Sequence, residues 1–179
     1  MATSARSLPK TVPGSALATP TDLDPAAVAK VAAALNTVVA DTFVLHMKTK
    51  NFHWHMSGKH FRDYHLMLDE QADGIEAAID PLAERVRKLG RETIRSFADV
   101  LKLTGLSESN GSNLSPAAMF EALIADNKAV IAGMRAAHKV CDDAGDVASA
   151  SLLENYIDEA ERRLWFLFET SQERGNDAT

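Results

Sequence analysis

The sequence predicts an all-α protein built around four long helices, and three observations lead to this prediction. Apolar residues recur at helical spacing through four long stretches of the chain. These stretches begin at residues that favour helix starts, as at Asp24-Pro25 and Ser115-Pro116. No segment alternates convincingly between apolar and polar residues, as a half-buried strand would.

Each helix is delimited by local signals. The first is expected from Pro25 to a break near Ser57-Gly58, and the second from about Lys59 to Leu89, stopping at Gly90. The third begins at Ser115-Pro116 and ends at the run 142–145, after which Asp146 caps the fourth. The short links at 57–59 and 143–146 predict two antiparallel hairpins, and the long 90–114 connection, with a short helix over 96–103, predicts a crossover.

Length and composition indicate one globular domain. The chain has 179 residues, of which 46% are apolar and 25% charged. We expect a bundle over 25–174, a flexible N-terminal tail over 1–24 and a C-terminal tail over 175–179. The net charge of −6 argues against a general nucleic-acid binder, and no apolar run approaches the roughly 20 residues of a membrane helix. A single cysteine, Cys141, rules out an intrachain disulfide and a cysteine-cluster metal site, and is expected to be a reduced, buried thiol.

The first 24 residues differ in composition from the rest. They are rich in Pro, Ser and Thr, and carry the cations Arg6 and Lys10 with no acid before Asp22. Two interpretations stay open: an inert tail, and an arm that touches phosphates through its cations. An organellar transit peptide is disfavoured because the prolines interrupt the amphipathic helix that it would form.

An unbalanced run of acids marks the second predicted helix. Between Arg62 and Arg85 there are seven carboxylates and no Lys or Arg, whereas a solvated helix face normally mixes charge signs. At about 100° per residue, one imidazole and five of these carboxylates fall within roughly 100° of arc. This stripe consists of His65, Asp69, Asp73, Glu76, Asp80 and Glu84. Imidazole with carboxylate suits iron or zinc better than calcium.

The stripe holds two pairs at i, i+4 spacing, His65/Asp69 and Asp80/Glu84. They lie 11 residues apart, or roughly 16 Å along a helix, so they cannot serve one ion within one chain. A second copy of the helix, antiparallel across a two-fold axis, would bring the pairs together, and the turn could fold His53 back toward His65. A di-iron centre inside one chain would use a Glu-x-x-His motif, and the sequence contains none. The shared site is therefore the better metal hypothesis.

Three sequence pieces, in this order and spacing, resemble the Dps family, the miniferritins named as DNA-binding proteins from starved cells. They are H-W-x-x-x-G at 53–58, H-x-x-x-D at 65–69 and D-x-x-x-E-R at 80–85, and the likeness covers about residues 25–170. The resemblance implies a ferritin-like four-helix bundle that assembles into a hollow homododecamer in the cytoplasm. It also implies a ferroxidase that oxidises Fe(II), preferably with hydrogen peroxide but otherwise with dioxygen, stores ferric mineral and protects DNA from oxidative damage. One subunit would supply His53, His65 and Asp69, and its two-fold mate Asp80 and Glu84, around at most two iron ions.

The remaining predictions are secondary. Trp54 is expected to pack beside the site. Candidates for an iron-entry pore are Asp142, Asp143, Asp146 and Glu154. Weak DNA contact through Arg6 and Lys10 would make the protein nucleoid-associated. Two rival functions remain to be tested: an architectural DNA-compacting protein with secondary metal binding, and a non-catalytic zinc-binding shell.

Overall fold

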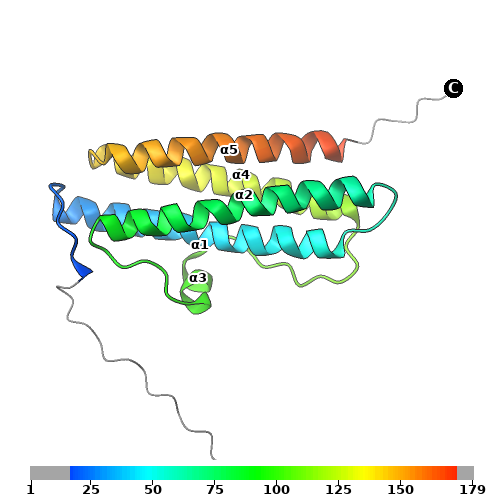
Figure 1. Cartoon of the computed structure of the whole chain (residues 1–179), viewed down its shortest axis with the longest axis horizontal. Coiled ribbons are helices and arrows are strands. Elements are labelled where there is room, and N and C mark those ends of the chain that lie inside the picture. Colours follow the sequence, from blue (N-terminus) through cyan, green and yellow to red (C-terminus); the bar gives the residue numbers. More distant parts are fainter. Residues whose placement is uncertain (1–16, 173–179) are drawn as a thin grey trace, which may run out of the picture.

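Five helices make up the protein between residues 17 and 172, the part of the chain that the computed structural model describes. Within this range there is no strand, and four long helices lie side by side while a short fifth helix lies outside them (Figure 1). The predicted all-α four-helix bundle with an extra helix in the long connection is confirmed. The helices are α1 (Pro25–His55), α2 (Phe61–Lys88), α3 (Phe97–Leu103), α4 (Pro116–Asp143) and α5 (Val147–Ser171).

The predicted helix ends are confirmed to within two residues because the signals that set them are local. The Asp24 carboxylate accepts hydrogen bonds from the backbone N–H groups of residues 26 and 27, each at 2.9 Å. Ser115 and Asp146 cap α4 and α5 in the same way. Gly90, just after α2, has a φ of +74°, a conformation that glycine adopts without steric cost.

The helices pack as two antiparallel hairpins, α1 with α2 and α4 with α5, joined mainly through α1 and α4. The crossover from α2 to α4 runs the length of the bundle and carries α3 against α1 (Figure 1). Buried Asp41 on α1 anchors it, accepting hydrogen bonds from the Thr104 hydroxyl at 2.8 Å and the Gly105 N–H at 2.7 Å. Helices α2 and α5 have the thinnest contact of the four neighbouring pairs in the bundle.

Helix α1 forms the centre of the core. It is long and apolar enough to cross a membrane by length and composition, the one such helix in the described part of the chain, yet 61% of its most apolar window is buried inside the bundle. Leu35, Leu45 and Phe52 are each at most 1% exposed. This burial is what the core helix of a bundle shows.

The described part of the N-terminal segment lies along the end of α2. The Thr19 hydroxyl donates to the Arg87 carbonyl at 3.1 Å, and the Arg87 guanidinium donates to the Leu17 carbonyl at 2.9 Å. Residues 1–16, with Arg6 and Lys10, and the predicted C-terminal tail 175–179 lie outside the described residues. The predicted domain boundaries therefore stay predictions.

Replacing Gly74, within α2, and Gly90, just after it, with alanine should change the stability of the fold in opposite directions. A methyl group at Gly74 would meet nothing within 4 Å, so we expect Gly74→Ala to stabilise the fold by about 0.5–1 kcal/mol through helix propensity. At Gly90 a Cβ would lie 2.6 Å from the Thr19 carbonyl oxygen, so Gly90→Ala should destabilise. Denaturant midpoints at one fixed protein concentration measure both changes. Equal denaturant midpoints for Gly90→Ala and Gly74→Ala would contradict this prediction.

Candidate metal site

Two histidines face each other across the α1–α2 turn. The ring centroids of His53 and His65 lie 3.7 Å apart with the planes 22° from parallel. Each ring also bonds the other residue's backbone: His53 Nδ1 lies 2.8 Å from the His65 carbonyl oxygen, and His65 Nδ1 lies 2.9 Å from the His53 carbonyl oxygen. The hairpin predicted from the sequence thus brings His53 back to His65.

These reciprocal hydrogen bonds determine the protonation of both rings. A carbonyl oxygen only accepts, so Nδ1 of His53 and of His65 must each carry the proton and donate it. In a neutral imidazole the other nitrogen, Nε2, then has a free lone pair. A hydrogen bond from one ring nitrogen to a carbonyl is the usual arrangement by which proteins orient a metal-binding histidine. Both rings are therefore prepared as metal ligands through Nε2.

Asp69 joins the two histidines in a cluster on one chain, although the three side chains by themselves do not converge on a metal position. One carboxylate oxygen of Asp69, Oδ1, lies 3.6 Å from His53 Nε2. The ammonium group of Lys50 donates to the same oxygen at 2.6 Å. This hydrogen bond is the main reason that the pKa of Asp69 is lowered, and it raises the pKa of Lys50. The carboxylate is thus ionised and already holds one positive charge.

Sequence reasoning missed Lys50. The acid run on the second helix was notable because it contains no cation, and the balancing charge comes instead from α1, one turn before His53. Lys50 and His53 are three residues apart in a predicted helix, so the sequence did place them on one face. The register between α1 and α2, which brings that face to Asp69, was not available from the sequence.

The second predicted pair is separate from this cluster. Asp80 and Glu84 are exposed on α2, and among residues 17–172 the only charged partner of either is Lys88, whose ammonium group lies 3.2 Å from the Glu84 carboxylate. Between residues 17 and 172, no set of three or more His, Cys, Asp or Glu side chains is arranged to hold a metal ion within one chain. The five predicted ligands therefore form two groups on a single subunit, and their joint role stays a proposal.

Trp54 does not pack within the chain. Its side chain is 56% exposed in the single chain, so its expected packing beside the site would require a second subunit and stays a prediction. The physical reason for this exposure is its helical position: Phe52 and His53 take the inward-facing positions at this end of α1, and Trp54 follows on the outer side.

The four pore candidates have different environments. Asp142 and Asp143 are exposed at the end of α4, where Lys139 pairs with Asp143 at 2.9 Å. Glu154 lies 3.0 Å from His138 Nε2 across α4 and α5. Asp146 is buried: it caps α5 and receives a hydrogen bond from Arg85 at 2.6 Å. Its carboxylate therefore has a structural contact and does not face solvent in this chain.

Cys141 is the buried thiol expected from the sequence. It is fully enclosed, and burial is the main cause that raises its pKa to about 11. The thiol is therefore protonated at neutral pH and is a poor nucleophile.

Comparison with known proteins gives one consistent result. The family described as a ferritin-like domain matches residues 32–173. The DNA protection during starvation protein of Brevibacillus brevis is 33% identical over 137 residues, which cover 76% of this chain and 91% of that protein.

Solved structures agree with the sequence comparison. Dps from Thermosynechococcus elongatus superposes with a TM-score of 0.82 at 29% identity, covering 86% of this chain and 98% of that one. The Dps protein of Vibrio cholerae O1, described as a member of a broad superfamily of ferritin-like diiron-carboxylate proteins, gives a TM-score of 0.81 at 28% identity, covering 87% and 98%. With the bundle, the crossover helix and the histidine pair in place, these matches show that the chain belongs to the ferritin-like family and, within it, to the Dps proteins.

Proposed function

We propose that this protein oxidises Fe(II) at sites shared between two-fold related copies and stores the ferric product inside a dodecameric shell. Iron storage and DNA protection are the functions that its family supports. The observation that carries the proposal is that Nδ1 of His53 and of His65 is bonded to a carbonyl oxygen, which leaves each Nε2 available, and that the Asp69 carboxylate lies 3.6 Å from the Nε2 of His53. Such a set of neutral imidazoles and a carboxylate binds Fe(II) as a substrate.

The second half of each site would come from Asp80 and Glu84 of another copy. These carboxylates lie roughly 16 Å further along α2, too far to reach an ion held by His65 and Asp69 of the same helix. Two α2 helices running antiparallel across a two-fold axis would place each pair opposite the other, twice per dimer. Both carboxylates are exposed and accessible to such an arrangement, in which Glu84 would exchange its contact with Lys88 for the metal ion.

The ligand types favour oxidation. Carboxylates add negative charge, which stabilises Fe(III) relative to Fe(II) and so lowers the free energy of electron loss. Two Fe(II) ions give up one electron each, and one hydrogen peroxide molecule accepts both electrons with two protons and leaves as two water molecules. Pairing two ions at one site therefore consumes the peroxide without releasing a hydroxyl radical.

Anaerobic titration of the metal-free protein with Fe(II), followed by hydrogen peroxide, tests this function. We expect ferric absorbance to appear much faster than in buffer, with two iron ions oxidised per peroxide. In a parallel sample that receives dioxygen in place of hydrogen peroxide, Fe(II) should be oxidised more slowly. A non-catalytic zinc-binding shell would take up metal without consuming peroxide, and this result would refute the proposal.

Lys50 is expected to compete with the metal for Asp69. Because its ammonium group holds the carboxylate oxygen at 2.6 Å, an incoming ion must displace it. We expect Lys50→Met to raise the affinity of the metal-free protein for Co(II) by roughly 2- to 5-fold, the scale of a partly exposed ion pair. Co(II) titration followed by visible absorbance measures this, with exposed Lys30→Met of α1 as the matched control. Equal affinity in both variants would show that Lys50 does not oppose binding.

Direct DNA contact is the weakest part of the proposal. The body carries a net charge of −6, so contact depends on Arg6 and Lys10 acting through many arms of one shell. Deleting residues 1–20 should abolish retention of duplex DNA in a gel while iron oxidation continues. An architectural DNA-compacting protein would instead bind duplex strongly and leave iron oxidation at the rate in buffer.

A further inference from the structure

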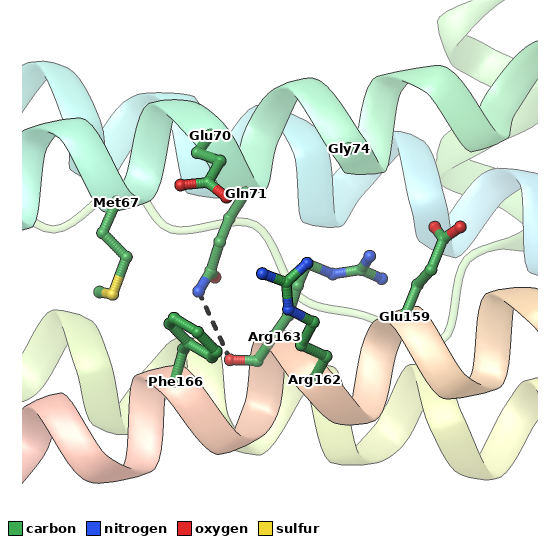
Figure 2. Close-up of a pocket in the computed structure, with 8 residues that line it drawn as sticks. All are labelled: Met67, Glu70, Gln71, Gly74, Glu159, Arg162, Arg163 and Phe166. Carbon is green, nitrogen blue, oxygen red and sulfur yellow. Dashed lines mark hydrogen bonds between the residues drawn. The ribbon is translucent and has the colours of Figure 1, made fainter.

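A pocket opens between α2 and α5, where these helices have their thinnest contact. Its volume is about 360 Å³, enough for a small ion with several waters at roughly 30 Å³ each. Figure 2 shows two guanidinium groups from α5 in the space between the helices. The lining residues are Met67, Glu70, Gln71, Gly74, Glu159, Arg162, Arg163 and Phe166.

Arg163 is the first residue of interest in this pocket. Its Nε atom is fully buried and has no hydrogen-bond partner. Burial is also the main cause that lowers the pKa of Arg163, and Glu159 offsets only part of that effect. A buried donor without a partner costs free energy. The Nε–H group of Arg163 lacks an acceptor among the described residues, while the side chain as a whole is half-buried.

Arg162 adds a second charge at the mouth of the pocket. Its guanidinium carbon lies 5.3 Å from the centre of the Phe166 ring, which holds it by a cation–π contact. Within residues 17–172, neither Arg162 nor Arg163 forms a salt bridge, although Arg85, Arg95 and Arg135 all do. Two adjacent arginines thus share one pocket without a salt bridge to either in the described part of the chain, although the carboxylates of Glu70 and Glu159 also line it.

The α2 side of the pocket leaves space for a ligand. Gly74 has no side chain, and a Cβ built there would meet nothing within 4 Å. Gln71, three residues before Gly74 on α2, donates a hydrogen bond from its side-chain amide to the Arg163 carbonyl oxygen at 3.4 Å. Figure 2 shows this bond between the two helices. The opening is therefore maintained by the packing of α2 and is accessible from the exposed Arg162 side.

We propose that this pocket binds hydrogen phosphate through the guanidinium groups of Arg162 and Arg163. The planar guanidinium fork matches the oxygens of a phosphate, and two of them can hold a tetrahedral ion from two sides. The ion would supply the acceptor that the Nε–H group of Arg163 lacks. Glu70 and Glu159 also line the pocket, and as acceptors they suit an anion that has an O–H to donate. Hydrogen phosphate has this group and sulfate at neutral pH does not.

This site is separate from the proposed iron chemistry. None of the pocket residues is among the proposed iron ligands, and positions 67, 70, 71 and 74 lie on a different arc of α2 from positions 65, 69, 80 and 84. Binding can therefore be measured on the metal-free protein, where no ferric phosphate can form.

Isothermal titration of the full-length, metal-free protein tests the proposal, with phosphate, sulfate and acetate compared at pH 7 and constant ionic strength. We expect phosphate to bind, and sulfate and acetate to bind at least tenfold more weakly. Arg162→Gln and Arg163→Gln should each weaken phosphate binding by roughly 10- to 100-fold, the effect of losing hydrogen bonds between charged groups. The control Arg135→Gln removes an equal charge from α4 outside the pocket and should bind phosphate as the native protein does.

A second pair of variants keeps the test decisive if Arg163→Gln does not fold. Gly74→Glu puts a carboxylate into the open space and should abolish phosphate binding, while Gly74→Ala adds a methyl group without charge and should retain it. The proposal is overturned if phosphate produces no binding heat, if sulfate binds as tightly, or if Arg135→Gln loses as much affinity as the pocket variants. A third result would also overturn the proposal: the native protein does not bind phosphate, and Arg162→Gln fails to assemble. The pocket would then be a contact with a neighbouring copy of the chain.

Discussion

Replacing His65 and Asp69 together with alanine is expected to slow peroxide-dependent iron oxidation by at least about 100-fold. The loss of one ligand-orienting contact alone typically costs 10- to 100-fold in metal affinity or activity, and this variant removes two proposed ligands. It also removes the ring that stacks on His53 and the hydrogen bond from His65 Nδ1 to the His53 carbonyl oxygen. Stopped-flow absorbance of the ferric product measures the rate.

The matched control for this variant is His60→Ala/Asp63→Ala. It removes the same two residue types from the N-cap and the first turn of α2, outside the proposed site. We expect it to assemble and to oxidise iron at close to the native rate. If the His65→Ala/Asp69→Ala protein assembled normally and oxidised iron within twofold of the native rate, these residues would not be the iron ligands.

The second large effect is expected on assembly. Helix α3 exposes Phe97 at 80% and Leu101 at 54%, next to Met47 of α1 at 56%. With other residues of α1 and the crossover these side chains line a groove of about 300 Å³. Soluble monomers rarely expose an apolar patch of this kind, and α3 packs on the helix that carries His53, so we expect a second copy to cover it.

Phe97→Glu/Leu101→Glu should therefore dissociate the shell. Light scattering is expected to find dimers or monomers in place of the proposed dodecamer, and iron oxidation should fall although every proposed ligand is present. Lys102→Glu, also exposed on α3, changes the charge without removing apolar area and should remain assembled. A dodecamer in both variants would place the subunit contact elsewhere.

The sequence predicted the helices because their limits depend on neighbours in the chain. Asp24 caps α1 through N–H groups two and three residues later, and Gly90 ends α2 through its own backbone conformation. The approach of His53 to His65 was predictable for the same reason, since a short turn joins them. Local signals therefore predicted the helices of the bundle and the approach of the two histidines in the candidate site.

Contacts between distant residues were not predictable in the same way. Lys50 reaches Asp69 only because α1 and α2 pack in one register, and Asp146 is buried because Arg85, 61 residues earlier, bonds to it. The pocket at Arg163 depends on the width of the gap between α2 and α5. Such features are set by packing, which the periodicity of one helix does not encode.

Assembly of mixed shells tests the shared site most directly. The His65→Ala/Asp69→Ala and Glu84→Ala variants, each expected to be strongly impaired alone, would be unfolded, mixed in equal amounts and refolded together. A site shared across a two-fold axis is intact only when the first variant supplies Glu84 and the second supplies His65 and Asp69, which random pairing gives in about one quarter of the sites. We therefore expect about one quarter of the native rate of iron oxidation. A mixed shell no more active than either parent would contradict the shared site.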